Sequence, residues 1–487
     1  MSSLKQQMMS GVMYTAVAKY SGIVISLVVM AVLARLLTPD DFGVVAIATV
    51  FINFFNIFTN IGISSAIVQF KDLTKREVNE IYMFTVWSGL LLSMLFAASA
   101  PFVAAYYDDT RLLSITLWLS LSLFFSSASI VPNSLFLKDK DFRFIAWRTL
   151  IIQLITGALS ILAALMGAGL YTLLIQPILS NLLLYLISLR RYPQHILPCT
   201  GINSLKKIWG YSVYQFLFNV MSYFIRNLDK MLIGRYIGMA ALGYYEKSYR
   251  LMSLPIQNLT FVVTPVLHPF LSDYQQSKEQ LGEINERIVR FLAFIGFPLS
   301  VGLYFCSKEL VLLFFGKQWM ASIPAFQILT LSCGLQIVMS SSGSFFQSNN
   351  DTRGLFICGL FTAIVTCTGY LACILFFPTL IGFAWGMVIS MFLCFVQCYW
   401  YLYNISLKRS IHYLCYQLFK PIVLSIVIFI VLSLYEQFTQ LSNLMLSLSV
   451  KIMISVLFWI TFICITKEST FIEVFKRKLK KISTSNE

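Results

Sequence analysis

Charged residues are scarce in this sequence, and their scarcity excludes a large soluble core. Only 12% of the 487 residues are Asp, Glu, Lys or Arg, whereas 58% are hydrophobic, and the mean hydropathy is +0.77. Soluble domains carry about 25% charged residues. Apolar windows of about 18 residues or more recur along the chain, each long enough to cross ~30 Å of hydrocarbon as a helix. The short alternating segments of an outer-membrane barrel are absent. The composition therefore predicts an all-α polytopic membrane protein.

Residues for metal binding and acid–base catalysis are also few. The chain has 3 histidines, and its 10 cysteines, Cys199 to Cys464, lie mostly inside apolar windows without the paired spacing of a zinc site. The segment HPFLSD (268–273) matches the His-four-Asp pattern of glycerolipid acyltransferases, but Pro269 follows the histidine and no soluble catalytic domain accompanies it. We therefore expect no enzyme, no metal and no cofactor.

The apolar windows predict about fourteen transmembrane helices. The first begins near residue 11 without a basic region or a small-residue cleavage site before it, so we expect it to be retained rather than removed as a signal peptide. The expected spans are 11–36, 42–69, 78–105, 112–136, 144–167, 170–189, 208–234, 242–270, 288–306, 323–348, 354–377, 381–405, 414–435 and 445–465.

Lysine and arginine in the connections predict the orientation of the chain. With a cytoplasmic N-terminus, 24 of the 36 basic residues fall in inside segments and 5 in outside connections. Because basic residues favour the cytoplasmic side, both termini are expected there. The net charge of +15 then reflects topology and attraction to anionic lipid, and it makes no case for nucleic acid.

Two pairs of segments repeat along the chain. ARLLTPDDFGVV (34–45) and GRYIGMAALGYY (234–245) share an arginine and a glycine eight residues apart, namely Arg35 with Gly43 and Arg235 with Gly243. SLFLKDKDFR (134–143) corresponds to SFFQSNNDTR (344–353) at an offset of 210. Two halves of six spans explain both matches, and an even number of spans predicts parallel repeats related by an axis along the membrane normal.

The repeats divide the chain into four expected parts. These are an N-terminal lobe (1–195, spans 1–6), a linker with a C-terminal lobe (196–405, spans 7–12), an appended helix pair (406–466, spans 13–14) and a basic cytoplasmic tail (467–487). The tail mixes apolar and basic residues, so it is expected either as an interfacial helix or as a solvated tail.

Charges inside the spans are the candidate functional residues, because they are costly in hydrocarbon unless they face water, a partner or a ligand. Only two acids, Asp229 and Glu246, lie within the predicted spans rather than near an end. Basic residues within the spans include Lys19, Arg148, Arg226, Lys230, Lys247, Arg250 and Lys451. This excess of positive charge suggests an anionic ligand.

The seventh span holds the densest cluster. Arg226, Asp229 and Lys230 lie three and four residues apart, so they share one helix face. One interpretation is a structural Arg–Asp pair in the bundle. The other is a cation site that lines a cavity, because Asp229 can neutralise only one of its two basic neighbours.

Lys19 lies eight residues into the first span, ~12 Å along the helix, and that span contains no acid. It could snorkel to the inner interface or turn into a polar cavity. Glu246 and Arg250 stand four apart and could pair. For the shallow Arg148 and Lys451 we expect snorkelling.

Arg35 and Arg235 each end the outward span of their half, where capping of the outer face is the default interpretation and support of the site the alternative. Gly43 and Gly243 are expected to let the chain turn into the next helix.

LARLLTPDDFGVVAIA (33–48), NLDKMLIGRYIGMAALGYYEKSYRLMSLP (227–255) and the plan of six, six and two spans resemble the polysaccharide-transport branch of the multidrug/oligosaccharidyl-lipid/polysaccharide exporter superfamily. The likeness is greatest to Wzx-type flippases of the colanic-acid-like subgroup, and it covers the whole chain. It implies alternating access, a cationic central cavity, and transfer of an undecaprenyl-diphosphate-linked oligosaccharide from the inner to the outer leaflet of the bacterial cytoplasmic (inner) membrane.

The resemblance also implies a role in the synthesis of a surface polysaccharide such as O-antigen (lipopolysaccharide), capsule or exopolysaccharide, and an association with the polysaccharide polymerase machinery. Lys19, Arg226 and Lys230 would meet the diphosphate. Asp229 or Glu246 would serve an ion gradient or membrane potential, with Arg250, Arg35 and Arg235 in support. By analogy with lipid II flippases, spans thirteen and fourteen would provide a lipid-facing groove.

Two alternatives stay open. A cation-coupled multidrug extruder of the same superfamily usually relies on a carboxylate in the first span, where this chain offers Lys19 and no acid. A non-transporting membrane scaffold built on the same fold is the second alternative.

Overall fold

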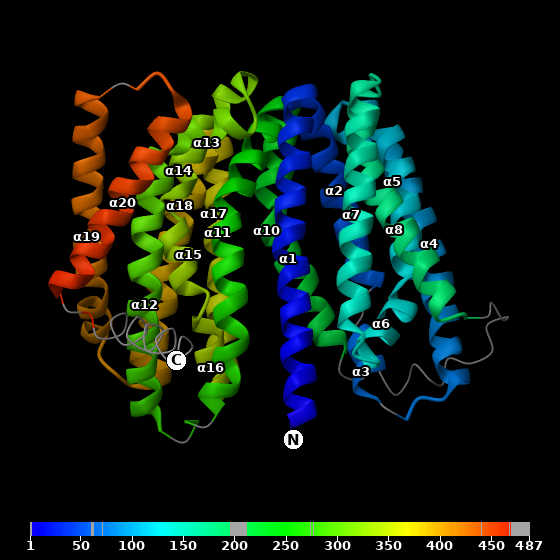
Figure 1. Cartoon of the computed structure of the whole chain (residues 1–487), viewed down its shortest axis with the longest axis horizontal. Coiled ribbons are helices and arrows are strands. Elements are labelled where there is room, and N and C mark those ends of the chain that lie inside the picture. Colours follow the sequence, from blue (N-terminus) through cyan, green and yellow to red (C-terminus); the bar gives the residue numbers. More distant parts are fainter. Residues whose placement is uncertain are drawn as a thin grey trace, which may run out of the picture. The chain divides into compact units, whose positions relative to one another are not determined.

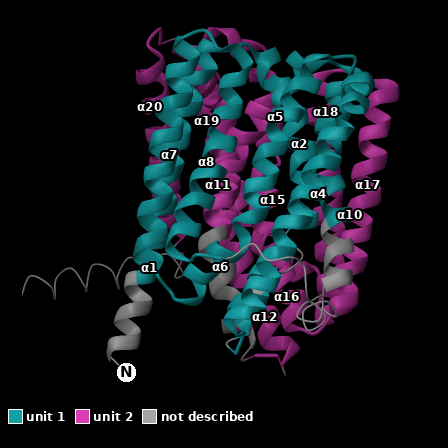
Figure 2. Cartoon of the chain, turned by 90° about the vertical axis from the view of Figure 1, so that its right-hand side faces the viewer, with its two compact units in different colours: residues 1–243 teal, residues 244–487 magenta. Residues whose placement is uncertain are grey.

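The computed structural model describes residues 2–59, 63–70, 72–194, 212–272, 274–275, 277–439, 441–466 and 468. This part of the chain is built from helices and contains no strand. It separates into two compact units, residues 1–243 and 244–487 (Figure 2). The predicted linker and basic tail lie almost entirely outside the described residues. The division into lobes at residue 195 stays a prediction.

In the first unit the long helices run side by side (Figure 1). Helix α1 packs on α7, α4 on α5, α8 on α5 and α7, and α10 on α2. Its elements are α1 (Ser2–Leu36), α2 (Pro39–Thr59), α3 (Ile63–Gln69), α4 (Lys75–Tyr107), α5 (Arg111–Ala128), α6 (Ile130–Lys138), α7 (Phe142–Leu165), η1 (Gly169–Tyr171), α8 (Thr172–Arg191) and α10 (Ser212–Tyr236).

In the second unit α12 packs on α19 and α15, and α17 packs on α18. The appended pair α19 and α20 adds an apolar core in which Leu424 and Ile428 meet Phe294. The elements are α11 (Met239–Ser272), α12 (Lys278–Phe305), α13 (Ser307–Phe314), η2 (Lys317–Ser322), α14 (Ile323–Thr330), α15 (Cys333–Met339), α16 (Ser342–Ser348), α17 (Thr352–Phe376), α18 (Leu380–Tyr401), η3 (Leu402–Leu407), α19 (His412–Phe438) and α20 (Leu444–Thr466).

The prediction of an all-α polytopic protein is confirmed. Among the described residues, 11 helices are long and apolar enough to cross a membrane, or 12 if the bent pair Lys317–Thr330 and Cys333–Ser348 counts as one span. The expected count of fourteen is not confirmed. Helices α10 and α11 coincide with predicted spans seven and eight but are not among the 11, and they carry most of the candidate charges.

The tenth predicted span, 323–348, is broken into α14, α15 and α16, with a bend of 42°. Serine explains part of the break. The hydroxyls of Ser332 and Ser340 donate to the carbonyls of Leu329 and Ile337 at 2.7 Å each, offering the backbone an alternative to the helical pattern. The apolar composition of the segment concealed this break.

The repeated segments fold alike. The turn between α6 and α7 has Lys140 at φ 58°, followed by the N-cap Asp141, and the turn between α16 and α17 has Asn350 at φ 54°, followed by the N-cap Asp351. Each aspartate accepts a hydrogen bond from the backbone N–H three residues on. The two segments that match in sequence at an offset of 210 therefore also form the same kind of turn.

Candidate functional site

The first turn of α2 explains the polar tip of the α1–α2 hairpin. The backbone N–H of Thr38 donates to Asp41 Oδ2 at 3.0 Å, and the backbone N–H of Asp41 donates back to Thr38 Oγ1 at 3.3 Å. This reciprocal arrangement is a capping box, which satisfies backbone donors that a helix start leaves unpaired. Asp41 therefore has a structural role in starting the helix.

The other aspartate of the tip, Asp40, forms an ion pair with the first residue of α5. Arg111 forms an ion pair with Asp40 at 2.6 Å and a two-pronged pair with Asp109, at 2.7 Å from Nη2 and 3.0 Å from Nε. Burial alone would raise the pKa of Asp109, but the hydrogen bonds and charge of Arg111 outweigh it, so the pKa of that carboxyl lies below its usual value. The start of α2 is thus tied to the start of α5.

Arg235, at the end of α10, forms an ion pair with Asp108 in the turn after α4. Its guanidinium lies 5.2 Å from the ring centroid of Tyr106. Arg35, its repeat partner, is exposed in the last turn of α1. The structure thus assigns Arg235 an anchoring contact, and a role of either arginine in a ligand site stays a prediction.

Gly43 and Gly243 do not act as turn residues, and that expectation was wrong. Both lie inside helices, and the left-handed glycine of the second hairpin is Gly238, at φ 116°. A Cβ on Gly43 would lie 1.8 Å from the carbonyl oxygen of Met239, and a Cβ on Gly243 would lie 1.9 Å from that of Pro39. The two glycines therefore permit the first turns of α2 and α11 to touch, backbone against backbone.

From Tyr223 onward, helix α10 is held against α2 and α4. Tyr107 of α4 donates its hydroxyl to the carbonyl of Met231 at 3.3 Å, and Tyr223 of α10 donates to the carbonyl of Val50 in α2. Aromatic side chains of α2 and α10 add a ring contact between Phe54 and Phe224 at 5.0 Å. The seventh predicted span therefore packs on the second.

The candidate cations lie on two helices of the first unit with different exposure. On α10, Arg226 is exposed, Lys230 is half-buried, and Asp229 is 3% exposed. The backbone N–H of Lys230 donates to Asp229 Oδ1 at 2.8 Å. Lys19 is half-buried on α1, which packs on α7. The gathering of these three cations around one cavity stays a prediction.

The candidates on α11 lie in the second unit. Glu246 is half-buried and Arg250 is exposed, while the neighbouring Lys247 is only 4% exposed. The expected Glu246–Arg250 pair stays a prediction, as does a coupling role of Glu246.

Arg148 does not snorkel, and that expectation was wrong. Its side chain is 6% exposed and bridges α8 and α6, donating to Ser188 Oγ at 2.8 Å and to Asn133 Oδ1 at 2.7 Å. The guanidinium also lies 5.0 Å from the centroid of Phe136. These partners are neutral and far away in sequence, so the local sequence offered no sign of them.

Lys451 does not snorkel either. It is 4% exposed on α20 and pairs with Glu309 of α13 at 2.7 Å and with Glu436 of α19 at 2.6 Å. The predicted spans ended at 306 and 435, which left both carboxylates outside the membrane segments. The pairing of Lys451 with these two carboxylates was therefore not predicted from the sequence.

A further charged cluster joins α12 and α19 to the residue that follows the end of α20. Arg290 of α12 and Lys420 of α19 both pair with Glu468, which follows α20 and is 3% exposed. Nearby, Arg409 pairs with Glu286 of α12 at 2.9 Å. These contacts fix the end of α20 against α12 and α19.

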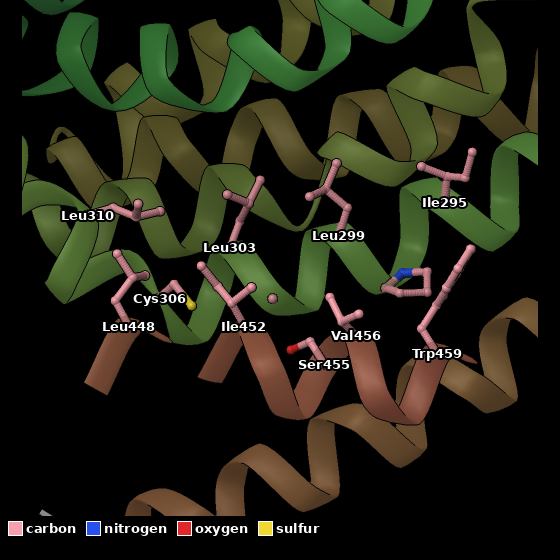
Figure 3. Close-up of a pocket in the computed structure, with 12 residues that line it drawn as sticks. Ile295, Leu299, Leu303, Cys306, Leu310, Leu448, Ile452, Ser455, Val456 and Trp459 are labelled. Atoms are coloured by element: carbon pink, nitrogen blue, oxygen red, sulfur yellow. The ribbon is translucent and has the colours of Figure 1, made fainter. Parts of the chain in front are cut away.

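An apolar groove of about 390 Å³ runs between α12 and α20 (Figure 3). Ile452 and Val456 on its α20 wall are 49% and 48% exposed, so the groove is open along one side. Of the two appended helices, α20 supplies the wall. Labelled lining residues include Leu299, Leu303, Leu310, Ile452, Val456 and Trp459.

Within the described residues, no group of three or more His, Cys, Asp or Glu side chains is placed to hold a metal ion. The fold is that of a helical protein with many membrane-spanning helices. Residues 32–324 match the family model described as "Polysaccharide biosynthesis protein", and the chain belongs to this family.

Relatives in sequence agree with this assignment. The chain is 27% identical over 472 residues to the teichuronic acid biosynthesis protein TuaB of Bacillus subtilis (strain 168), covering 92% of this chain and 94% of TuaB. It is 26% identical to the succinoglycan biosynthesis transport protein ExoT of Rhizobium meliloti (strain 1021), over 74% and 75% of the two chains. It is 23% identical to the lipopolysaccharide biosynthesis protein WzxC of Escherichia coli (strain K12), over 71% of each.

Solved structures share the fold. The lipid II flippase MurJ in an inward closed conformation superposes with a TM-score of 0.71 at 14% identity, over 94% of this chain and all (100%) of MurJ. An inward-facing MATE-family multidrug transporter superposes with a TM-score of 0.57 at 14% identity, over 77% and 93%. The expectations of a transporter fold, of the superfamily and of a chain that is not an enzyme are confirmed.

Proposed function

We propose that this protein is a flippase that moves an undecaprenyl-diphosphate-linked oligosaccharide from the inner to the outer leaflet of the bacterial cytoplasmic membrane. The observation that carries the proposal is the excess of basic residues on α1 and α10, which carry Lys19, Arg226 and Lys230 but only one carboxylate, Asp229. Arginine and lysine are the side chains that bind phosphate oxygens. A diphosphate headgroup matches this excess of positive charge.

The names of the relatives support a polysaccharide pathway. One is a transport protein of succinoglycan biosynthesis and another a protein of lipopolysaccharide biosynthesis. A polysaccharide polymerase complex is then the expected partner of this chain.

Transfer requires alternating access, and the first unit contains contacts suited to it. The touching turns at Gly43 and Gly243 and the Arg235–Asp108 ion pair hold α10 and the start of α11 against α2 and α4. If spans 7–12 move as one lobe against spans 1–6, these contacts close the outer side and must separate when that side opens.

The groove between α12 and α20 supports a role in lipid handling. Its walls are apolar and it opens sideways at Ile452 and Val456, as a groove for a polyprenyl chain in hydrocarbon would. Both termini are cytoplasmic in this proposal, which follows from the distribution of basic residues.

A multidrug extruder that exports organic cations is disfavoured by α1. Its sequence, Ser2–Leu36, contains no aspartate or glutamate, and Lys19 would repel a cationic substrate. The lipid analysis described next distinguishes a flippase from a scaffold protein without transport activity.

The test is an intact-mass analysis of polyprenyl-diphosphate lipids from cells that lack the protein. Accumulation of one oligosaccharide-lipid, cleared when the gene is restored, is the expected result. Unchanged lipids together with unchanged surface polysaccharide would overturn the proposal. Restoration with a Lys19→Glu, Arg226→Glu variant of normal abundance is expected to leave the lipid accumulated.

A further inference from the structure

The ammonium group of Lys451 uses all of its donors inside the second unit. It donates to the backbone carbonyl of Phe305 at 2.8 Å, to Glu309 Oε1 at 2.7 Å and to Glu436 Oε1 at 2.6 Å. An ammonium carries three donors and no acceptor, so none is left for a further oxygen.

Glu309 lacks a donor for its second oxygen. Its Oε1 accepts from Lys451 and from the hydroxyl of Ser447 at 2.7 Å, whereas Oε2 is buried and has no hydrogen-bond partner among the described residues. The hydroxyl of Ser455 donates to the backbone carbonyl of Lys451 and so does not donate to Glu309. Glu309 is 4% exposed, so its Oε2 is a buried carboxylate oxygen to which no described protein group donates a hydrogen bond.

The cluster carries one negative charge in excess, because two carboxylates share one ammonium. Lys451 lies seven residues after the start of α20, ~10 Å along the helix. An uncompensated charge at such a position is expensive.

Other titratable groups nearby do not neutralise the excess negative charge of the cluster. Cys306 is buried beside the cluster, and a thiol is neutral in its protonated form. Lys308 and Lys317 belong to α13 and η2 but are exposed, so water and salt screen their charges.

We propose that Glu309, Glu436 and Lys451 form a site for one monovalent cation, a proton or Na⁺, that binds at Glu309 Oε2. A proton would form an O–H bond there and leave Lys451 paired with Glu436, which makes the cluster neutral. Na⁺ would be held by carboxylate oxygens, the ligands that hard cations prefer. The side chain of Glu436 is 47% exposed and provides the route for the ion to enter.

Occupation of this site would weaken the Lys451–Glu309 pair, which ties α20 to α13. The inference concerns binding alone, so it stands whether or not the chain moves a lipid. In a flippase, the same site would couple the movement of α20 to an ion gradient.

The experiment is thermal unfolding of the purified full-length protein in detergent. One series varies pH from 5 to 8 in potassium buffer without sodium, and the other varies Na⁺ from zero to 200 mM at fixed pH, with choline keeping the ionic strength constant. Ligand binding to the folded state raises the unfolding temperature by mass action. A response to pH alone identifies a proton, and a response to Na⁺ alone identifies sodium.

Glu309→Gln removes the excess charge and is expected to abolish the response. Glu279→Gln changes an exposed carboxylate of α12 and is the matched control, expected to respond as the unmodified protein does. Should Glu309→Gln fail to fold, Glu436→Gln takes its place, because it neutralises the cluster equally. A flat response of the unmodified protein in both series, or an undiminished response in the glutamine variant, would overturn the proposal.

Discussion

Gly43 and Gly243 occupy reciprocal positions: the Cα of each faces the backbone carbonyl that begins the other's helix. An added Cβ on Gly43 would meet Met239 O at 1.8 Å, and one on Gly243 would meet Pro39 O at 1.9 Å. The two residues are also the repeat-related pair that the sequence analysis found. The repeat therefore marks a contact between its own two copies.

Gly43→Ala is expected to force the first turns of α2 and α11 apart, because a backbone carbonyl cannot move aside as a flexible side chain can. Overpacking of this kind costs about 1–3 kcal/mol. The measurement is thermal unfolding in detergent, together with labelling of a cysteine introduced next to the contact. Lower stability and faster labelling are the expected results.

Gly359→Ala is the matched control, because a Cβ at this helical glycine meets nothing within 4 Å. Gly243→Ala should act through the same contact, so the double variant should cost less than the sum of the single variants. Additive effects would show that the two glycines are energetically independent.

The pKa of Asp109 gives a pH dependence with a definite sign. Its pKa is lowered in the folded protein, so its stabilisation is present above the unfolded value of about 3.9 and is lost as pH falls through the lower folded value. Because Arg111 is 38% exposed, the pair is worth no more than about 1 kcal/mol. Asp109→Asn should therefore lower the unfolding temperature at pH 7, and the gap should close toward pH 3.

Asp72→Asn serves as the control, because Asp72 is an exposed residue of the turn before α4. It should leave the unfolding temperature unchanged at both pH values. A gap between the unmodified protein and Asp109→Asn that persists undiminished at pH 3 would contradict the assignment of the Arg111–Asp109 pair.

The sequence was sufficient to predict the features that local pattern controls. Hydropathy predicted the long helices, and the offset of 210 matched two segments that the structure shows to share a left-handed residue, Lys140 or Asn350, before an aspartate cap. The break of the tenth span escaped because serine hydroxyls compete with the helix without lowering apolar character much.

Features that depend on distant partners could not be predicted. Lys451 and Glu309 are 142 residues apart in sequence, and Arg148 and Ser188 are 40 apart, so no window of the sequence contains both members of either pair. The role of Gly43 was predicted wrongly for the same reason. Its missing side chain makes room for the backbone of Met239, which is distant in sequence.

Filling the groove between α12 and α20 tests its role in lipid handling. A Cβ at Gly302 meets only Ser455 Oγ, at 3.8 Å, so Gly302→Leu should fit without backbone strain while its side chain occupies the groove. We expect nearly unchanged thermal stability and slower clearance of the lipid-linked oligosaccharide in cells. Gly359→Leu, on α17, is the control, and equal clearance by both variants would exclude the groove from transport.

Charge reversal at Lys19 and Arg226 tests the cation site itself. Each charge-assisted hydrogen bond to a phosphate is worth about 1.5–3 kcal/mol, so Lys19→Glu or Arg226→Glu should slow transfer by about tenfold or more. The measurement is the ratio of accumulated oligosaccharide-lipid to surface polysaccharide at matched protein abundance.

Arg353→Glu provides the control, because Arg353 is exposed in the first turn of α17, away from α1 and α10 in sequence. If the loss were a general effect of charge on insertion, this variant would fail as well, since basic residues at span ends help to set orientation. A normal ratio in Arg353→Glu with a raised ratio in both other variants would assign the loss to binding of the anionic headgroup. A normal ratio in all three would remove Lys19 and Arg226 from the site.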